Sequence, residues 1–144
     1  MDLGPEQLRS DLDALVQALV EIHPDAIDLV GRERFDALVA DAEGSLASGG
    51  DAGRLWVVAA PLVAAVGDGH TLLLPPRPAA GRATPWQLVE RDGGVWVEGW
   101  GTSSGPSIPE GGARLVSIDG VPAGAAYETL LASVPGETAS FRRV

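Results

Sequence analysis

The spacing of hydrophobic residues changes from helical to strand-like between residues 66 and 72, and this change constrains the fold most. Apolar residues before this point recur every three or four positions, which is typical of amphipathic helices. Beyond Val66-Gly67-Asp68-Gly69-His70-Thr71-Leu72 they form short runs separated by Gly- and Pro-rich turns, which is typical of strands. The pattern predicts an α+β fold: a three-helix bundle in residues 1–66, followed by a small β-rich region in residues 67–144.

Three helices are expected in the first region, at residues 6–22, 32–46 and 52–66. Asp51 follows Ser48-Gly49-Gly50 and is a candidate N-cap of the third helix. Apolar side chains occupy almost every side of the third helix. We therefore expect this helix to be buried on most sides, with a core that includes Trp56, Val57, Leu62 and Val63.

The second region is expected to contain a hairpin, a further strand and a short helix. The two strands of the hairpin are placed at 87–90 and 95–98, the further strand at 113–118, and the helix at 124–134. Asp92-Gly93 and Asp119-Gly120 are typical of tight turns. The helix is expected to turn Tyr127, Leu130, Leu131 and Val134 inward. Residues 75–85 and 101–112 are rich in Gly, Pro, Ala and Ser and are expected to be loops.

The charge of the chain argues against several classes of partner. Asp and Glu number 20 against ten basic residues, all of them arginine, and the net charge is −10. Phosphate backbones and anionic membrane surfaces attract clustered cations, so we expect neither nucleic acid nor an anionic membrane as a partner. No run of 18 apolar residues predicts membrane insertion. The compartment stays open: cytoplasmic if Met1 is the native start, secreted or periplasmic if a targeting segment was removed.

Composition also limits the chemistry. The sequence contains neither lysine nor cysteine, which excludes a lysine or thiol nucleophile within residues 1–144. No serine lies in a Gly-x-Ser-x-Gly motif, and Ser103 and Ser104 are interpreted as part of a polar loop. His23 and His70 lack the spacing of a helical zinc pair, so no metal or other cofactor is expected. His23 precedes Pro24 at a helix end, where a structural role is favoured.

His70 is the candidate catalytic residue. Glycine on either side of Asp68 explains a turn, since glycine adopts positive φ at little cost. It does not explain the imidazole, which titrates near neutral pH and is a common general base. On these residues alone, a catalytic His70 and a histidine that only completes the turn both stay open.

The order of several short motifs resembles a known family. Residues 12–24 read L-D-A-L-V-Q-A-L-V-E-I-H-P, and V-G-D-G-H-T follows the third helix. G-A-R-L-V-S-I-D-G-V-P and V-P-G-E come later. Over roughly residues 8–138, this order resembles the N-terminal part of the tail-specific (C-terminal processing) serine peptidases, in the branch of the tricorn protease core and interphotoreceptor retinoid-binding protein.

This resemblance implies a helical bundle, a partly PDZ-like β-rich region, and a separate α/β domain that carries the nucleophilic serine. It implies that His70 serves as general base for that serine, although other branches use a lysine instead. The Gly-Leu-Gly-Phe loop typical of PDZ domains is absent from the sequence.

The leading hypothesis is thus that the chain is the N-terminal, non-nucleophile region of a tricorn-like serine endopeptidase. Alone, it is expected to have no proteolytic activity. Its expected partners are a C-terminal catalytic domain and a peptide or protein substrate. The alternative is a free-standing peptide- or protein-binding module without catalytic activity. The reading frame beyond Val144 distinguishes the two, because the peptidase requires a downstream serine in a strand-to-helix turn.

Overall fold

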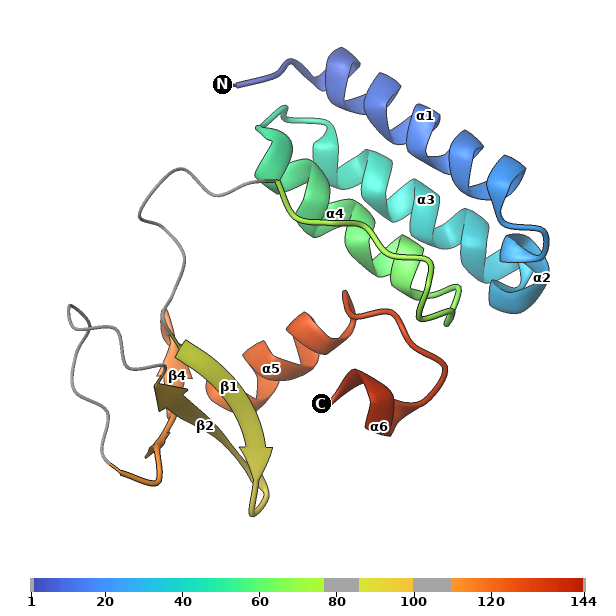
Figure 1. Cartoon of the computed structure of the whole chain (residues 1–144). Helices are drawn as coiled ribbons and strands as arrows, with labels where there is room; N and C mark the ends of the chain where they lie inside the picture. The colour runs from blue at the N-terminus through green and yellow to red at the C-terminus, as the bar shows by residue number, and fades with distance from the viewer. Residues whose placement is uncertain (1, 77–85, 100–109, 144) are drawn as a thin grey trace. The chain divides into compact units, whose positions relative to one another are not determined.

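The computed structural model describes residues 2–76, 86–99 and 110–143, which form two compact units (Figure 1). One unit comprises Met1–Arg77 and Ala132–Arg142, and the other comprises Pro78–Leu131 and Arg143–Val144. The expected α+β class is confirmed: helices that pack together are followed by small antiparallel sheets and a further helix. Most of the two expected loops, with Ser103 and Ser104, lies outside the described residues.

The first unit contains four helices before residue 66, where three were expected. Their bounds are α1 Pro5–Ile22, α2 Ala26–Val30, α3 Arg32–Leu46 and α4 Ala52–Ala64. The expected N-cap of α4 is confirmed, because the Asp51 carboxylate accepts the Arg54 N–H at 2.9 Å. α2 was missed because five residues are too few for a visible periodicity. Burial of Ala26 and Val30 stabilises it, rather than intrinsic helix propensity.

Two adjoining groups of side chains form the core of the helical unit. One group is centred on Leu62 and includes Leu19, Phe35 and Val63. The other contains Leu8, Leu12, Ala42, Leu46 and Ala59. The expectation that α4 is buried on most sides is wrong in part, because Val57 is 60% exposed and Trp56 is only partly buried. α4 packs mainly against α1 and α3, and these two neighbours cover only part of its surface.

An indole fixes the segment that follows α4. Trp56 Nε1 donates a hydrogen bond of 2.9 Å to the carbonyl oxygen of Leu73. Leu73 also packs against both groups of core side chains. Residues 71–74 therefore lie against the helices without a strand partner in the described structure.

The second unit contains the predicted hairpin. Strand β1 (Trp86–Arg91) pairs antiparallel with β2 (Gly94–Gly99), and β2 pairs with β3 (Ala113–Arg114). The turn residues Asp92 and Gly93 have φ of 53° and 68°, as a type I′ turn requires. The predicted turn at Asp119-Gly120 is confirmed too, between β4 (Ser117–Ile118) and β5 (Val121–Pro122).

Two expectations for this region were wrong in detail. The strand expected at 113–118 is two short strands in separate sheets, β3 and β4. The helix α5 (Ala123–Leu131) ends before Val134, and Leu130 is 46% exposed. α5 has nine residues and buries one face, with Tyr127 and Ala123 against Val95. Leu131 packs partly against the same side chains, whereas Leu130, near the end of the helix, does not.

Among the described residues, no helix combines the length and the apolar character needed to cross a bilayer.

Candidate functional site

The Gly67–Thr71 segment is a tight turn organised around one carboxylate. Gly67 has φ of 75°, a left-handed conformation that costs other residues roughly 1–2 kcal/mol. The Asp68 carboxylate then accepts the backbone N–H of His70 at 2.9 Å and the hydroxyl of Thr71 at 2.7 Å. The Thr71 N–H closes the turn by donating to the Asp68 carbonyl at 3.1 Å. Gly67, Asp68 and Thr71 are thus explained by the turn itself, whereas the His70 ring is not.

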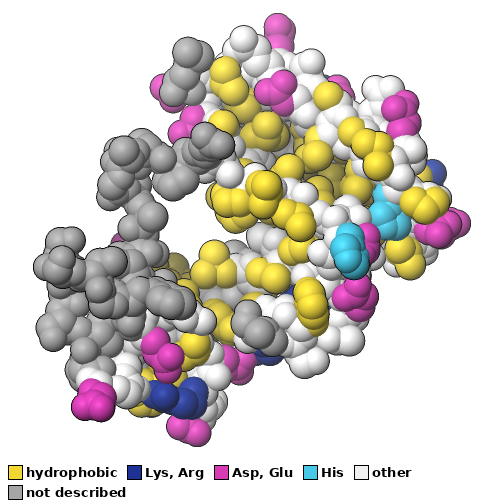
Figure 2. Space-filling view, viewed as in Figure 1, with side chains coloured by type: hydrophobic (Ala, Val, Ile, Leu, Met, Phe, Trp, Pro, Cys, Tyr) yellow, Lys and Arg dark blue, Asp and Glu magenta, His cyan; other side chains and the backbone are white. Residues whose placement is uncertain are grey.

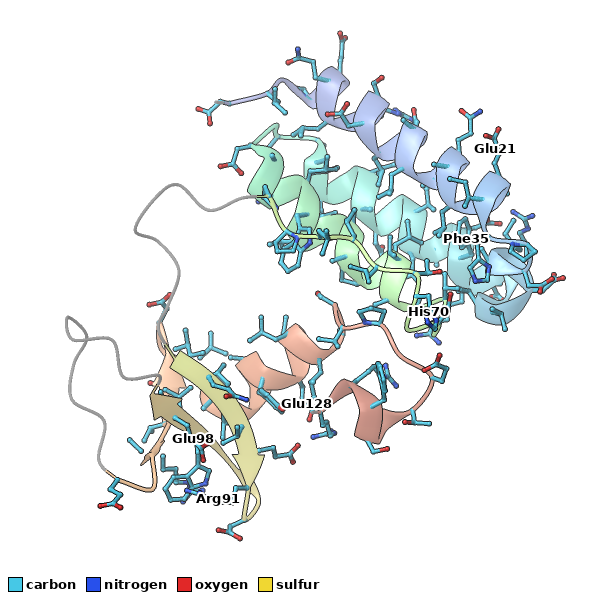
Figure 3. All side chains as sticks on the ribbon, in the orientation of Figure 1. Glu21, Phe35, His70, Arg91, Glu98 and Glu128 are labelled. Atoms are coloured by element: carbon cyan, nitrogen blue, oxygen red, sulfur yellow. The ribbon has the colours of Figure 1, made fainter. Side chains whose placement is uncertain are left out.

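The His70 ring projects into solvent at the end of the helical unit where α4 ends (Figure 3). Its side chain is 96% exposed, and Nδ1 lies 3.3 Å from Asp68 Oδ1. In the described structure, no hydrogen bond engages Nε2. When Nδ1 carries the proton and donates it to Asp68, Nε2 is left as a free acceptor that faces outward.

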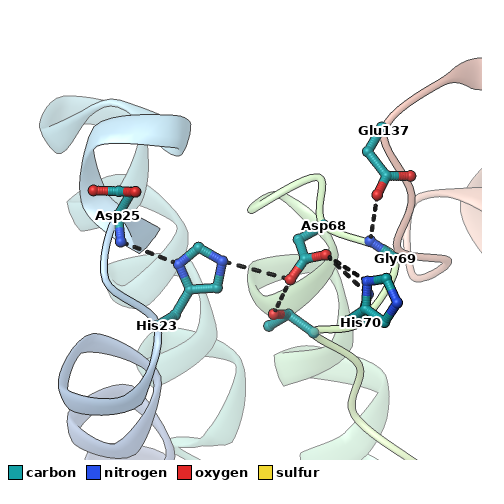
Figure 4. Close-up of polar contacts among 7 residues, drawn as sticks. His23, Asp25, Asp68, Gly69, His70 and Glu137 are labelled. Atoms are coloured by element: carbon teal, nitrogen blue, oxygen red, sulfur yellow. Dashed lines mark hydrogen bonds and ion pairs between the residues drawn. The ribbon is translucent and has the colours of Figure 1, made fainter.

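His23 contacts the same carboxylate from the opposite side (Figure 4). Its side chain is only 15% exposed, Nδ1 accepts the Asp25 N–H at 3.2 Å, and Nε2 lies 3.5 Å from Asp68 Oδ2. Because Nδ1 accepts, the ring proton of neutral His23 is on Nε2 and points toward Asp68. His23 therefore helps to position Asp68, a role that the sequence interpretation did not assign.

Bundle topology brings the two histidines together. Because α1 and α4 both run antiparallel to α3, their C-terminal ends lie at the same end of the unit (Figure 1). His23 caps α1 by donating its N–H to the Leu19 carbonyl at 3.0 Å, and His70 follows α4. The chain order of three up-and-down helices could have predicted this proximity; motif spacing could not.

Hydrogen bonding lowers the pKa of the Asp68 carboxyl to about 2. The main cause is the His70 backbone N–H, followed by the Thr71 hydroxyl; both donate to the charged form and stabilise it. Partial removal from water acts in the opposite direction but is outweighed. Asp68 is therefore a carboxylate at every pH where a histidine can act as a base.

An open pocket of about 530 Å³ lies beside this cluster. Its polar wall consists of His23, Asp68, His70 and Thr71, and the rest is mainly apolar, from the end of α1 and the segment after the turn. Figure 2 shows both histidines close together on one face, next to hydrophobic side chains. A mainly apolar hollow with a few convergent polar groups is the usual form of a binding or active site.

Glu137 ties a distant segment to the turn. Its Oε1 accepts the Gly69 N–H at 3.3 Å. A Cβ at Gly69 would lie 3.4 Å from both Glu137 and Phe141, at van der Waals contact, so these two side chains pack close against the turn. Glu137 belongs to the V-P-G-E motif, yet nothing in its local sequence indicates that it would reach residue 69.

The cluster has the geometry of two members of a catalytic triad. A carboxylate orients the imidazole through Nδ1, and the opposite nitrogen remains available to take a proton from a nucleophile. No serine hydroxyl in the described residues forms a hydrogen bond with His70. Within those residues, the geometry supplies a carboxylate that orients the ring and an imidazole nitrogen that is free to accept a proton.

The depressed pKa of Asp68 makes the turn acid-sensitive. Because the folded-state value is about 2 and the ordinary value is 3.8, the stabilisation from Asp68 is present above 3.8 and is lost as the pH falls toward 2. We expect the Asp68 carboxyl carbon to titrate below 3.8 in an NMR pH titration, with the His70 amide shift following it. A midpoint at or above 3.8 would show that these hydrogen bonds do not persist in solution.

No protein-family model, curated protein or solved structure matches the chain.

Proposed function

We propose that residues 1–144 are the non-nucleophile region of a serine endopeptidase of the tail-specific, tricorn-like type, and that His70 is its general base. The observation that carries this proposal is the Asp68–His70 pair: an ionised carboxylate on Nδ1, and Nε2 exposed beside a pocket. The motif order around Gly-Asp-Gly-His-Thr adds support from sequence.

In this proposal, His70 first accepts a proton and then donates the same proton. Nε2 removes the proton from a serine hydroxyl as the oxygen attacks the scissile carbonyl carbon, and the imidazolium then gives that proton to the departing amine. Asp68 stays ionised and stabilises the imidazolium through Nδ1. His23 and Thr71 hold Asp68 in the orientation that this role requires.

The serine comes from a catalytic domain that packs against the exposed face of His70. A ring that is 96% exposed cannot by itself exclude water from a reacting centre, whereas an incoming domain can. Such a domain, or the substrate that it holds, would cover the apolar pocket beside His70.

A binding module without catalysis is the second candidate. Two apolar side chains of the pocket wall are strongly exposed, Ile22 at 81% and Leu72 at 49%. Exposed apolar groups around a hollow are also typical of a protein-binding surface. A module of this kind needs no serine nucleophile in any associated domain.

Active-site labelling separates the two candidates. We expect the isolated 144-residue chain neither to hydrolyse casein nor to react with a fluorophosphonate probe, because it lacks an activated nucleophile. The product of the whole reading frame that contains these residues should react at one serine and cleave casein. Stoichiometric labelling of the isolated chain would contradict the proposal that the nucleophilic serine lies outside residues 1–144. A full-length product that is never labelled would support the binding module.

A further inference from the structure

Three potential metal ligands from two distant segments meet at the turn after α4. One ligand atom each from Asp68, His70 and Glu137 can be chosen so that all three lie within 4.8 Å of one another (Figure 4). Asp68 and His70 belong to the turn, and Glu137 arrives from the segment before α6 (Ala139–Arg142). The set therefore consists of one imidazole nitrogen and two carboxylates, which differs chemically from a patch of acidic residues.

We propose that Asp68, His70 and Glu137 bind a divalent transition-metal ion of the Zn²⁺ type. Imidazole nitrogen and carboxylate oxygen are both ordinary zinc ligands, at about 2.0–2.2 Å from the ion. Two such ligands on a tetrahedral ion are about 3.4 Å apart. Asp68 Oδ1 and His70 Nδ1 are already 3.3 Å apart, so these two atoms need little movement to share an ion.

The surrounding hydrogen bonds leave the required atoms accessible. Thr71 and His23 contact Asp68 through Oδ2, so Oδ1 accepts only from His70. The Gly69 N–H engages Oε1 of Glu137, and Oε2 remains available to an ion. Such outer contacts orient the ligands of metal sites and raise their affinity. Both His70 and Glu137 are exposed, which leaves room for water to complete the coordination.

Metal binding and proton transfer by His70 exclude each other. An ion on Nδ1 replaces the proton there, so the remaining ring proton of the neutral imidazole must lie on Nε2. Nε2 then cannot accept a proton from a nucleophile. The site would thus act as a reversible inhibitory switch on the proposed base, while binding itself does not depend on the peptidase proposal.

Calorimetric titration of the 144-residue chain with ZnCl₂ tests the site. We expect saturable binding of one ion, and His70→Ala and Glu137→Gln should each weaken it by at least ~10-fold, the lower end of the effect of altering even outer contacts. Glutamine at 137 still accepts the Gly69 N–H, so the turn is retained. Glu33→Gln, at an exposed glutamate on α3, is the matched control and should bind as the wild type does.

Two results would overturn the proposal. One is the absence of saturable Zn²⁺ binding by the wild-type chain. The other is equal affinity in the wild type, His70→Ala and Glu137→Gln, with circular dichroism showing that all three are folded. Neither result depends on a serine nucleophile, so failure of the metal site is distinct from failure of the proposed peptidase function.

Discussion

Replacing Leu62 by alanine is expected to lower the free energy of unfolding by about 2–5 kcal/mol. Leu62 is 1% exposed and packs in the group of core side chains that contains Leu19, Phe35 and Val63. Its truncation removes buried methyl groups and leaves a cavity that surrounding helices fill only partly. Urea denaturation followed by circular dichroism measures the change.

Val57→Ala is the matched control on the same helix. Val57 is 60% exposed, and surface substitutions of this kind usually change stability by less than about 0.5 kcal/mol. Equal stability losses in the two variants would contradict the packing of α4, and so would unchanged stability in Leu62→Ala.

The helices and turns that were predicted correctly have strong local signals. α3 has the predicted bounds, Arg32–Leu46, because its apolar positions recur at helical spacing and Gly31 separates it from α2. The hairpin between β1 and β2 was predictable because Asp92-Gly93 readily adopts the positive φ values that a two-residue turn needs. In both cases the determining interactions lie within a few residues of one another.

Elements that depend on tertiary packing were not predictable in the same way. α2 has five residues, and its periodicity cannot be distinguished from loop sequence. The exposure of Val57 depends on which faces of α4 the neighbouring helices cover, and composition does not show this. The division of residues 113–118 between two sheets likewise follows from pairing partners distant in the chain.

The candidate site shows the same limit. The turn around His70 could be predicted from Gly-Asp-Gly, and an aspartate two residues before His70 is well placed to accept its N–H. The contact of His23 with Asp68 needs the order and direction of the helices. The contact of Glu137 with Gly69 joins two segments of the first unit that are separated in the sequence by nearly the whole second unit. No local pattern indicates it.

The second large effect concerns His70 in the product of the whole reading frame. We expect His70→Ala to lower kcat for peptide hydrolysis by at least ~10²-fold, the usual scale for losing acid–base assistance. The melting temperature should stay nearly unchanged, because the ring is 96% exposed, its contact with Asp68 lies at the surface, and the variant keeps the backbone N–H that Asp68 accepts in the turn. Asp68→Asn should lower kcat too, since an amide cannot stabilise the imidazolium as a carboxylate does.

The role of His70 is therefore tested by measuring kcat and melting temperature side by side for the wild-type full-length protein and its His70→Ala variant. We expect a loss of at least ~10²-fold in kcat with an unchanged melting temperature, and partial recovery of activity when free imidazole is added to the variant. Full activity in His70→Ala, or a loss that follows unfolding alone, would show that His70 only completes the turn.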